Sequence, residues 1–180
     1  MNKKISTRKI VISGALIALT LAIAPFSWFS WGPTKAFPGQ HLINVLAGII
    51  LGPVWAMVVA AIAGTLRITF GIGTIFAYPG GIPGGFVVGV FYLLIKKLFG
   101  REKALLISPW TEPVGTVLIG GTLSWYLFDP LMGGKMHGKF GILLPFFAGW
   151  ALSSIIGAAI SFLIIISLER IGFLKRLEKE

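Results

Sequence analysis

Long apolar stretches alternate along this chain with short segments rich in Gly, Pro and aromatic residues. Crossing the hydrocarbon core of a bilayer, about 30 Å thick, takes about 20 apolar residues in a helix. The pattern predicts an all-α integral membrane protein, a single domain over residues 1–180 with six transmembrane helices. The second stretch is short, so we expect it to tilt into the protein or to cross only partly. The predicted helices cover residues 8–26, 40–51, 53–70, 82–99, 104–128 and 142–171.

Basic residues cluster at the ends of the apolar stretches. Cytoplasmic loops of membrane proteins carry an excess of Lys and Arg, so both termini and the loop at 100–103 are predicted to lie inside. The loops predicted outside are residues 27–39, 71–81 and 129–141, and their length favours a binding site on the outer face. Lys35, Lys135 and Lys139 lie in these outer loops, against the charge rule. The basic clusters are Lys3, Lys4, Arg8 and Lys9; Lys96, Lys97, Arg101 and Lys103; and Arg170, Lys175, Arg176 and Lys179.

Composition supports one compact membrane domain. Of the 180 residues 56% are hydrophobic and 12% are charged, and the charged share is roughly half that of a soluble domain. The net charge of +10 does not indicate nucleic-acid binding, because the clusters flank apolar helices and would orient the protein and contact anionic lipid. The start resembles a signal peptide ending at Ala22-Ile23-Ala24, but Pro25 disfavours cleavage, so we expect a retained first helix in the cell membrane.

Small residues recur at a spacing of four in three of the predicted helices. Such ridges let helices approach closely in lipid, and packing within one chain is their ordinary role. The first helix of a small bundle is often peripheral, so its ridge is predicted to dock another membrane subunit. The ridges are Gly14, Ala18 and Ala22; Ala56, Ala60 and Gly64; and Gly149, Ser153, Gly157 and Ser161.

Two ionisable residues fall within predicted spans, where charge is costly and usually functional. Glu112 lies between Pro109 and Pro113, which remove backbone donors and are expected to bend or open the helix. We expect Glu112 to contact a ligand, although a protonated Glu bonded to a neighbouring helix is the alternative. Arg67, in the outer third of its helix, either extends to the interface or pairs with Glu112 or a ligand.

A polar corner opens the second predicted helix. Gln40 and Asn44 lie one turn apart with His41 beside them, which predicts ligand contact, although helix capping is the alternative for Gln40. Trp28, Trp31 and Lys35 precede this corner. Tyr78, Trp125 and Tyr126 either complete an aromatic pocket or belong to the interfacial aromatic belt. Asp129 and His137 are weaker candidates.

The sequence carries no pattern typical of an enzyme. Residues 133–140 approach a P-loop but end in Phe and follow a membrane span instead of a strand. Two distant His residues and the absence of Cys give no metal-ligand spacing, so neither a metal nor a cofactor is expected. An intramembrane enzyme would need paired groups at one depth, and only Glu112 is available. A self-sufficient carrier would show an inverted repeat or a polar stripe, and neither is visible.

The chain resembles the substrate-binding S components of energy-coupling factor (ECF) vitamin transporters, and most closely the thiazole-specific ThiW group. The resemblance covers nearly the whole chain. It rests on the run Gly32-Pro33-Thr34-Lys35-Ala36-Phe37-Pro38-Gly39-Gln40-His41 continuing to Asn44 and Gly48, on Leu51-Gly52-Pro53, on Gly71-Ile72-Gly73-Thr74 with Tyr78-Pro79-Gly80, and on Glu112-Pro113-Val114-Gly115-Thr116.

The resemblance implies an S-component-like bundle in which outer loops 1, 3 and 5 cover the binding site. It implies capture of hydroxyethylthiazole, the thiazole precursor of thiamine, and docking on a transmembrane T component through Gly14, Ala18 and Ala22. Two cytoplasmic ATPases would then drive inward release. Substrate contacts are expected from Glu112, His41, Gln40, Asn44, Tyr78, Trp125 and Arg67. An S component for thiamine, a pyrimidine precursor or biotin remains an alternative.

Overall fold

The structure is a computed structural model that describes residues 6–31 and 34–179. Lys3 and Lys4 of the first basic cluster and Gly32-Pro33 of the first outer loop lie outside the described residues. The same holds for the side chains of Thr34, Glu178 and Lys179.

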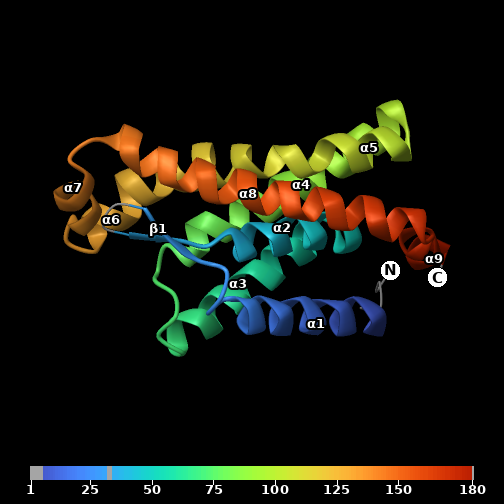
Figure 1. The fold of residues 1–180 in the computed structure, drawn as a ribbon, viewed down its shortest axis with the longest axis horizontal. Helices are drawn as coiled ribbons and strands as arrows, with labels where there is room; N and C mark the ends of the chain where they lie inside the picture. The colour runs from blue at the N-terminus through green and yellow to red at the C-terminus, as the bar shows by residue number, and fades with distance from the viewer. Residues whose placement is uncertain (1–5, 32–33, 180) are drawn as a thin grey trace, which may run out of the picture.

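Helices occupy all six of the predicted apolar stretches, as Figure 1 shows. The fifth stretch is one continuous helical run from Arg101 to Leu131, built from several kinds of turn. The helices are α1 (Thr7–Ile23), α2 (Pro38–Leu51), α3 (Pro53–Thr69), α4 (Ala77–Phe99), α5 (Arg101–Ile107), η1 (Ser108–Thr111), η2 (Val114–Gly121), η3 (Ser124–Phe128), α6 (Asp129–Leu131), α7 (Lys135–Phe140), α8 (Leu143–Arg170) and α9 (Phe173–Lys179).

The segments predicted as outer loops contain regular structure that hydropathy did not indicate. The strands β1 (Phe29–Trp31) and β2 (Thr34–Ala36) form an antiparallel hairpin in the first of them. In the second, α4 begins at Ala77 instead of Ile82, because Pro79 is tolerated in the first turn of a helix. In the third, α6 and α7 are short helices.

The two prolines beside Glu112 do not open the helix. Pro109 lies in the 3-10 turn η1, and Pro113 immediately precedes η2, whose turns are of the wide π type. A Cβ atom on Gly115 would collide with the backbone of Pro83. The fifth helical run therefore lies directly against the proline-containing part of α4, with Glu112 at the start of this close contact.

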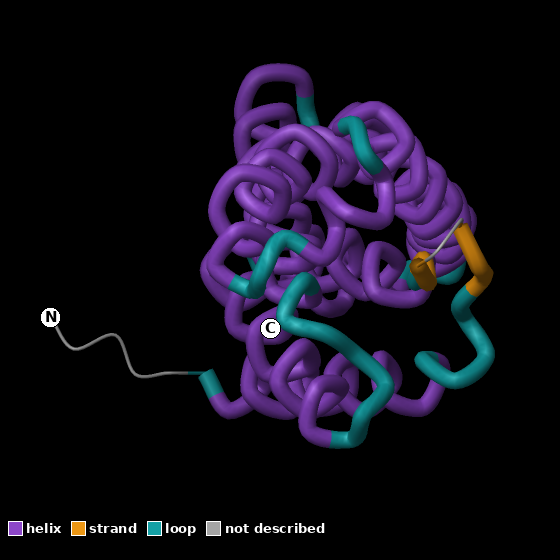
Figure 2. The backbone as a smooth tube through the Cα atoms, turned by 90° about the vertical axis from the view of Figure 1, so that its left-hand side faces the viewer, coloured by secondary structure: helices purple, strands orange, loops and turns teal. Residues whose placement is uncertain are grey.

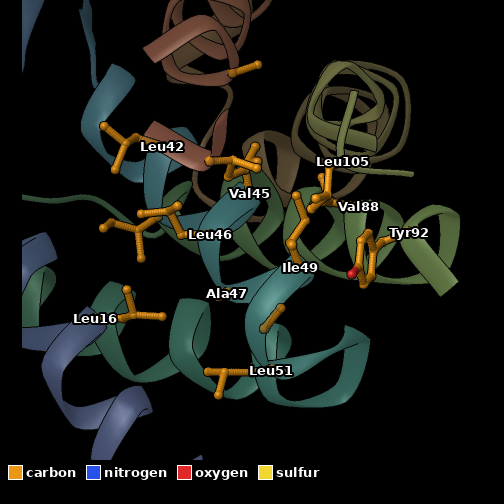
Figure 3. Packing of buried hydrophobic residues seen from close by; sticks show 14 of the residues in the cluster. Leu16, Leu42, Val45, Leu46, Ala47, Ile49, Leu51, Val88, Tyr92 and Leu105 are labelled. Atoms are coloured by element: carbon orange, nitrogen blue, oxygen red, sulfur yellow. The ribbon is translucent and has the colours of Figure 1, made fainter. Parts of the chain in front are cut away.

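The centre of the bundle is α2, which is buried along nearly its whole length. Figure 3 shows Val45 and Ile49 of this helix packed between Leu16 of α1 on one side and Val88 and Tyr92 of α4 on the other. The helix has 14 residues, which is about 21 Å of length and less than the thickness of the hydrocarbon core.

Two of the predicted small-residue ridges pack within the chain. Ala56 of α3 lies against α4, where a Cβ on Gly85 would approach it to 3.1 Å. On α8, a Cβ on Gly157 would meet His41 of α2, and the Ser161 hydroxyl donates to the Leu42 carbonyl at 3.0 Å. The ridge of α1 is different, because Gly14, Ala18 and Ala22 are all exposed, whereas α1 buries Ser13, Leu16 and Thr20.

The bundle has two distinct ends. One carries the N-terminal start of α1, α9 and the start of α5, whereas the other carries β1, α6 and α7 (Figure 1). Viewed toward the latter end, the helices are seen nearly end-on and the hairpin lies at one side of them (Figure 2). Within the described ranges, α4 and α8 are long and apolar enough to cross a membrane, and α2 and α3 are shorter apolar helices. Six membrane crossings stay a prediction.

Candidate functional site

A cluster of polar side chains surrounds Glu112 in the interior. The Glu112 carboxyl group is fully buried. Its Oε1 atom accepts hydrogen bonds from Asn44 Nδ2 at 2.9 Å and from Thr116 Oγ1 at 2.6 Å. His41 Nδ1 lies 2.9 Å from the same oxygen, and Ser154 Oγ donates to Oε2. Glu112 therefore joins α2, the fifth helical run and α8.

The geometry of this cluster fits a carboxylate. Asn44, Thr116 and Ser154 carry protons to donate, His41 can donate from Nδ1, and a carboxylate can accept from each of them. Both the Nδ1–H tautomer of His41 and its imidazolium donate to Oε1. Gly84 permits the arrangement, because a Cβ there would collide with Glu112 Oε1 and with Thr116 Oγ1.

A cavity of about 420 Å³ lies between the hairpin, the segment before α4, α7 and the start of α8. Its volume is typical of a small-molecule site. Six aromatic side chains lie in its wall, and polar and basic side chains are spaced around it. The aromatic residues are Trp28, Trp31, Phe37, Phe76, Phe146 and Trp150, and the polar and basic ones include Lys35, Gln40, His41, Arg67, Lys139 and Ser153.

His41 connects the cavity with the buried cluster. It lines the cavity while its Nδ1 atom contacts Glu112. Glu112 and Asn44 are not among the residues that line the cavity in the described part of the chain. A ligand in the cavity would thus contact His41 directly. Glu112 would affect the ligand only indirectly, by fixing the orientation and the proton position of the His41 ring.

Gln40 and Arg67 form a second polar pair on the cavity wall. Arg67 Nη1 donates to Gln40 Oε1, and Gln40 Nε2 donates to the Ala77 carbonyl at 3.2 Å. The Arg67 guanidinium also lies over the Phe37 ring, 4.4 Å from its centroid. Gln40 and Asn44, which were predicted to share one face, therefore serve different partners. The predicted alternative pairing of Arg67 with Glu112 is wrong, because these contacts hold Arg67 at Gln40.

Two predicted aromatic contacts lie away from the cavity. The Tyr78 hydroxyl is 3.0 Å from the Thr65 hydroxyl of α3. Trp125 packs behind the cavity wall, with its ring centroid 5.4 Å from that of Phe146. Neither Tyr78 nor Trp125 lines the cavity that the described residues form.

The start of α8 supplies cavity residues that the sequence analysis missed or assigned to packing. The sequence pattern predicts no role for Phe146 and Trp150, and it predicts that Gly149 and Ser153 belong to a packing ridge. All four line the cavity, and their spacing of three and four residues is the signal that they share one helix face. Gly149 is required here, because its Cβ would collide with the Trp31 ring.

Asp129 and His137 hold α7 in place at the cavity. The Asp129 carboxylate accepts the backbone N–H groups of Met136 at 2.8 Å and His137 at 2.9 Å, and the His137 Nδ1 atom lies 2.5 Å from it. Burial by itself raises the pKa of Asp129, but these hydrogen bonds outweigh it and lower the pKa below the ordinary value. Met136 and Lys139 of α7 line the cavity, so this contact shapes one of its walls.

Asp129→Asn is expected to loosen α7. The amide cannot accept all three hydrogen bonds, so amide exchange across residues 133–141 should be about tenfold faster, equivalent to about 1.4 kcal/mol. Because the pKa of Asp129 is depressed, its contribution is complete above about pH 4 and is lost as pH falls further. Hydrogen exchange from pH 5 to 8 should therefore show no pH dependence of local opening from this group. Equal exchange in Asp129→Asn and a Lys135→Gln control would contradict the assignment.

Two helices long and apolar enough to span a membrane, and a cavity of small-molecule size, are the features expected of a membrane protein that binds a small molecule. Residues 10–171 match the family model described as thiamine-precursor transporter protein (ThiW). The match covers most of the chain. The chain therefore belongs to this family of transporters. The protein is therefore a transporter of a thiamine precursor and not an enzyme. No curated protein and no solved structure matches the chain.

Proposed function

We propose that the chain is the substrate-capture subunit, or S component, of an ECF-type importer, and that it binds the thiazole precursor of thiamine, hydroxyethylthiazole, from outside. The cavity between the hairpin, α7 and α8 carries this proposal. A thiazole is a small flat aromatic ring, which the aromatic wall suits. Its ring nitrogen accepts a hydrogen bond, and its hydroxyl donates and accepts one, which Gln40, His41 and Ser153 can match.

The arrangement of charge supports an outward-facing cavity in a six-span membrane protein. The cavity lies at the end of the bundle that carries α7, and the described parts of the basic clusters, at the start of α1, around the α4–α5 junction and around α9, lie at the other end. There Arg101 Nη2 donates to Glu169 Oε2 at 2.7 Å, which joins the start of α5 to the end of α8. Excess Lys and Arg are typical of the cytoplasmic side, which supports the proposal that both termini lie on the cytoplasmic side of the cell membrane.

The exposed ridge on α1 supports docking on a T component. Gly14, Ala18 and Ala22 lie on the side of α1 that faces away from the bundle, and a Cβ on Gly14 would meet nothing. In lipid, exposed small residues at this spacing permit close approach of a second helix. Because the sequence has no ATPase motif, the energy would come from two cytoplasmic ATPases attached to the T component. A self-sufficient carrier is the alternative, and it would transport without them.

Fluorescence titration tests the substrate assignment. Trp28, Trp31 and Trp150 line the cavity, so a bound aromatic ligand should change tryptophan emission. We expect saturable binding of hydroxyethylthiazole, and at least tenfold weaker binding of thiamine, biotin and the thiamine pyrimidine. Trp150→Phe should reduce the change in tryptophan emission on binding, although the cavity keeps an aromatic side chain at this position. Tighter binding of one of the other compounds would transfer the assignment to that compound.

A further inference from the structure

Arg67 is a buried cation whose hydrogen-bonding capacity is largely unused. It is 3% exposed, yet it lines the cavity. Nη1 donates to Gln40, whereas Nε is fully buried without an acceptor. Among the side chains that the structure describes, no carboxylate forms an ion pair with Arg67. A guanidinium has five N–H donors, and burying a charge without compensation costs several kcal/mol. The hydrogen bond to Gln40 and the contact with the Phe37 ring compensate this cost only in part.

The rest of the cavity wall is also basic. Lys35 and Lys139 line the cavity together with Arg67, and none of the Asp and Glu side chains in the described ranges does. The Lys35 amine is held 4.0 Å from the centroid of the Trp28 ring. Both lysines belong to segments predicted to lie outside, where the charge rule disfavours them. The orientation of the protein in the membrane does not explain these two lysines, whereas a positively charged wall of the cavity does.

We propose that the cavity binds its ligand as an anion, with a phosphate or carboxylate group on Arg67 and the ring against the aromatic wall. This inference rests on the proposed function. Together they make the ligand a thiazole with an acidic group, such as the phosphate ester of hydroxyethylthiazole. Lys35 and Lys139 add positive charge around the same group. Arginine suits this task because its planar fork binds two oxygen atoms of an oxyanion at once.

Gln40 prepares Arg67 for this contact. Its Oε1 atom accepts from Arg67 while its Nε2 atom is anchored on the Ala77 carbonyl at 3.2 Å. The Phe37 ring covers one face of the guanidinium. These contacts fix the plane of the guanidinium before a ligand arrives, which lowers the entropic cost of binding. A neutral alcohol would leave the charge uncompensated, and one ring with a short arm fills only part of about 420 Å³.

Calorimetry on the full chain in zwitterionic nanodiscs tests the inference, with hydroxyethylthiazole and its phosphate ester as the two probes. At low salt we expect the ester to bind at least tenfold tighter. Arg67→Gln should abolish this preference, Arg67→Lys should retain part of it, and Arg170→Gln, at the basic end, should leave it unchanged. Thermal unfolding of each variant separates loss of binding from loss of folding. If Arg67→Gln fails to fold, Lys139→Gln should still reduce the preference severalfold.

The outcomes separate this inference from the proposed function. Equal or tighter binding of the neutral alcohol by the unmodified protein would overturn the anion site and leave the thiazole assignment standing. Arg67-dependent binding of thiamine monophosphate or of a phosphorylated pyrimidine, without binding of either thiazole, would overturn the thiazole assignment and support the anion site. Failure of all these anionic compounds to bind would overturn the anion site.

Discussion

Glu112→Ala is expected to weaken ligand binding at least tenfold and to lower the stability of the protein. The substitution leaves the His41, Asn44, Thr116 and Ser154 donors without their shared acceptor in the interior. Removing one partner from a buried charged contact typically costs about 3–5 kcal/mol. We expect the variant still to fold, with a lower unfolding temperature in detergent, and calorimetry with the best-binding ligand would measure the loss of affinity.

Glu112→Gln is the matched control for this effect. The amide oxygen accepts from the donors on the Oε1 side, and its NH₂ group donates to Ser154 if that hydroxyl reorients. We therefore expect most of the stability to return. A double-mutant cycle with His41→Ala tests whether Glu112 acts through His41, because the double variant should bind little worse than the weaker single variant. Additive losses would show that Glu112 contacts the ligand independently of His41.

Ala18→Trp is expected to abolish uptake and leave ligand binding within about twofold of normal. Ala18 is exposed on α1, away from the cavity, so the substitution spares the site. A Trp side chain on a small-residue ridge holds the neighbouring helix too far away for close packing. Transport measured in liposomes that contain the proposed T component and the two proposed ATPases should fall at least tenfold.

Leu163→Trp is the control for a large side chain in the lipid-facing surface. Leu163 is a large, exposed residue of α8. A Trp at this position enlarges a side chain on the exposed surface of α8 and leaves the ridge on α1 unchanged. Uptake should stay near normal in this variant. Normal uptake by Ala18→Trp as well would reject the α1 ridge as the docking face.

The helices were predictable because their apolar stretches are long and their ends are marked by Gly and Pro. Gly52 and Gly100, both with φ of 88°, end α2 and α4 at the predicted positions. The hairpin, the early start of α4 and the α6–α7 segment were not predictable from hydropathy. Those segments are short and rich in Gly, Pro and aromatic residues, and their structure depends on contacts such as Trp31 against Gly149.

The site was partly predictable, because polar residues stand out in apolar helices. Glu112 stood out because an acid in an apolar helix is costly, and the spacing of Gln40, His41 and Asn44 indicated a polar helix face. The sequence could not show that Asn44 and His41 point to Glu112 whereas Gln40 points to Arg67. That division depends on how α2 lies between α3, the fifth helical run and α8. Trp150 was not predictable as a cavity residue, because a single aromatic residue in an apolar helix does not differ from its apolar neighbours in the sequence pattern.

The distribution of Glu112's partners along the chain bears on how the protein is made. Its partners begin at His41 and end at Ser154, so most of the polypeptide must be synthesised before the cluster is complete. Until α8 emerges from the ribosome, Glu112 lacks its Ser154 donor and α2 lacks the α8 surface that packs against His41. Truncation before Ser154 should therefore leave the Glu112 cluster incomplete, and we expect such a chain not to bind the ligand.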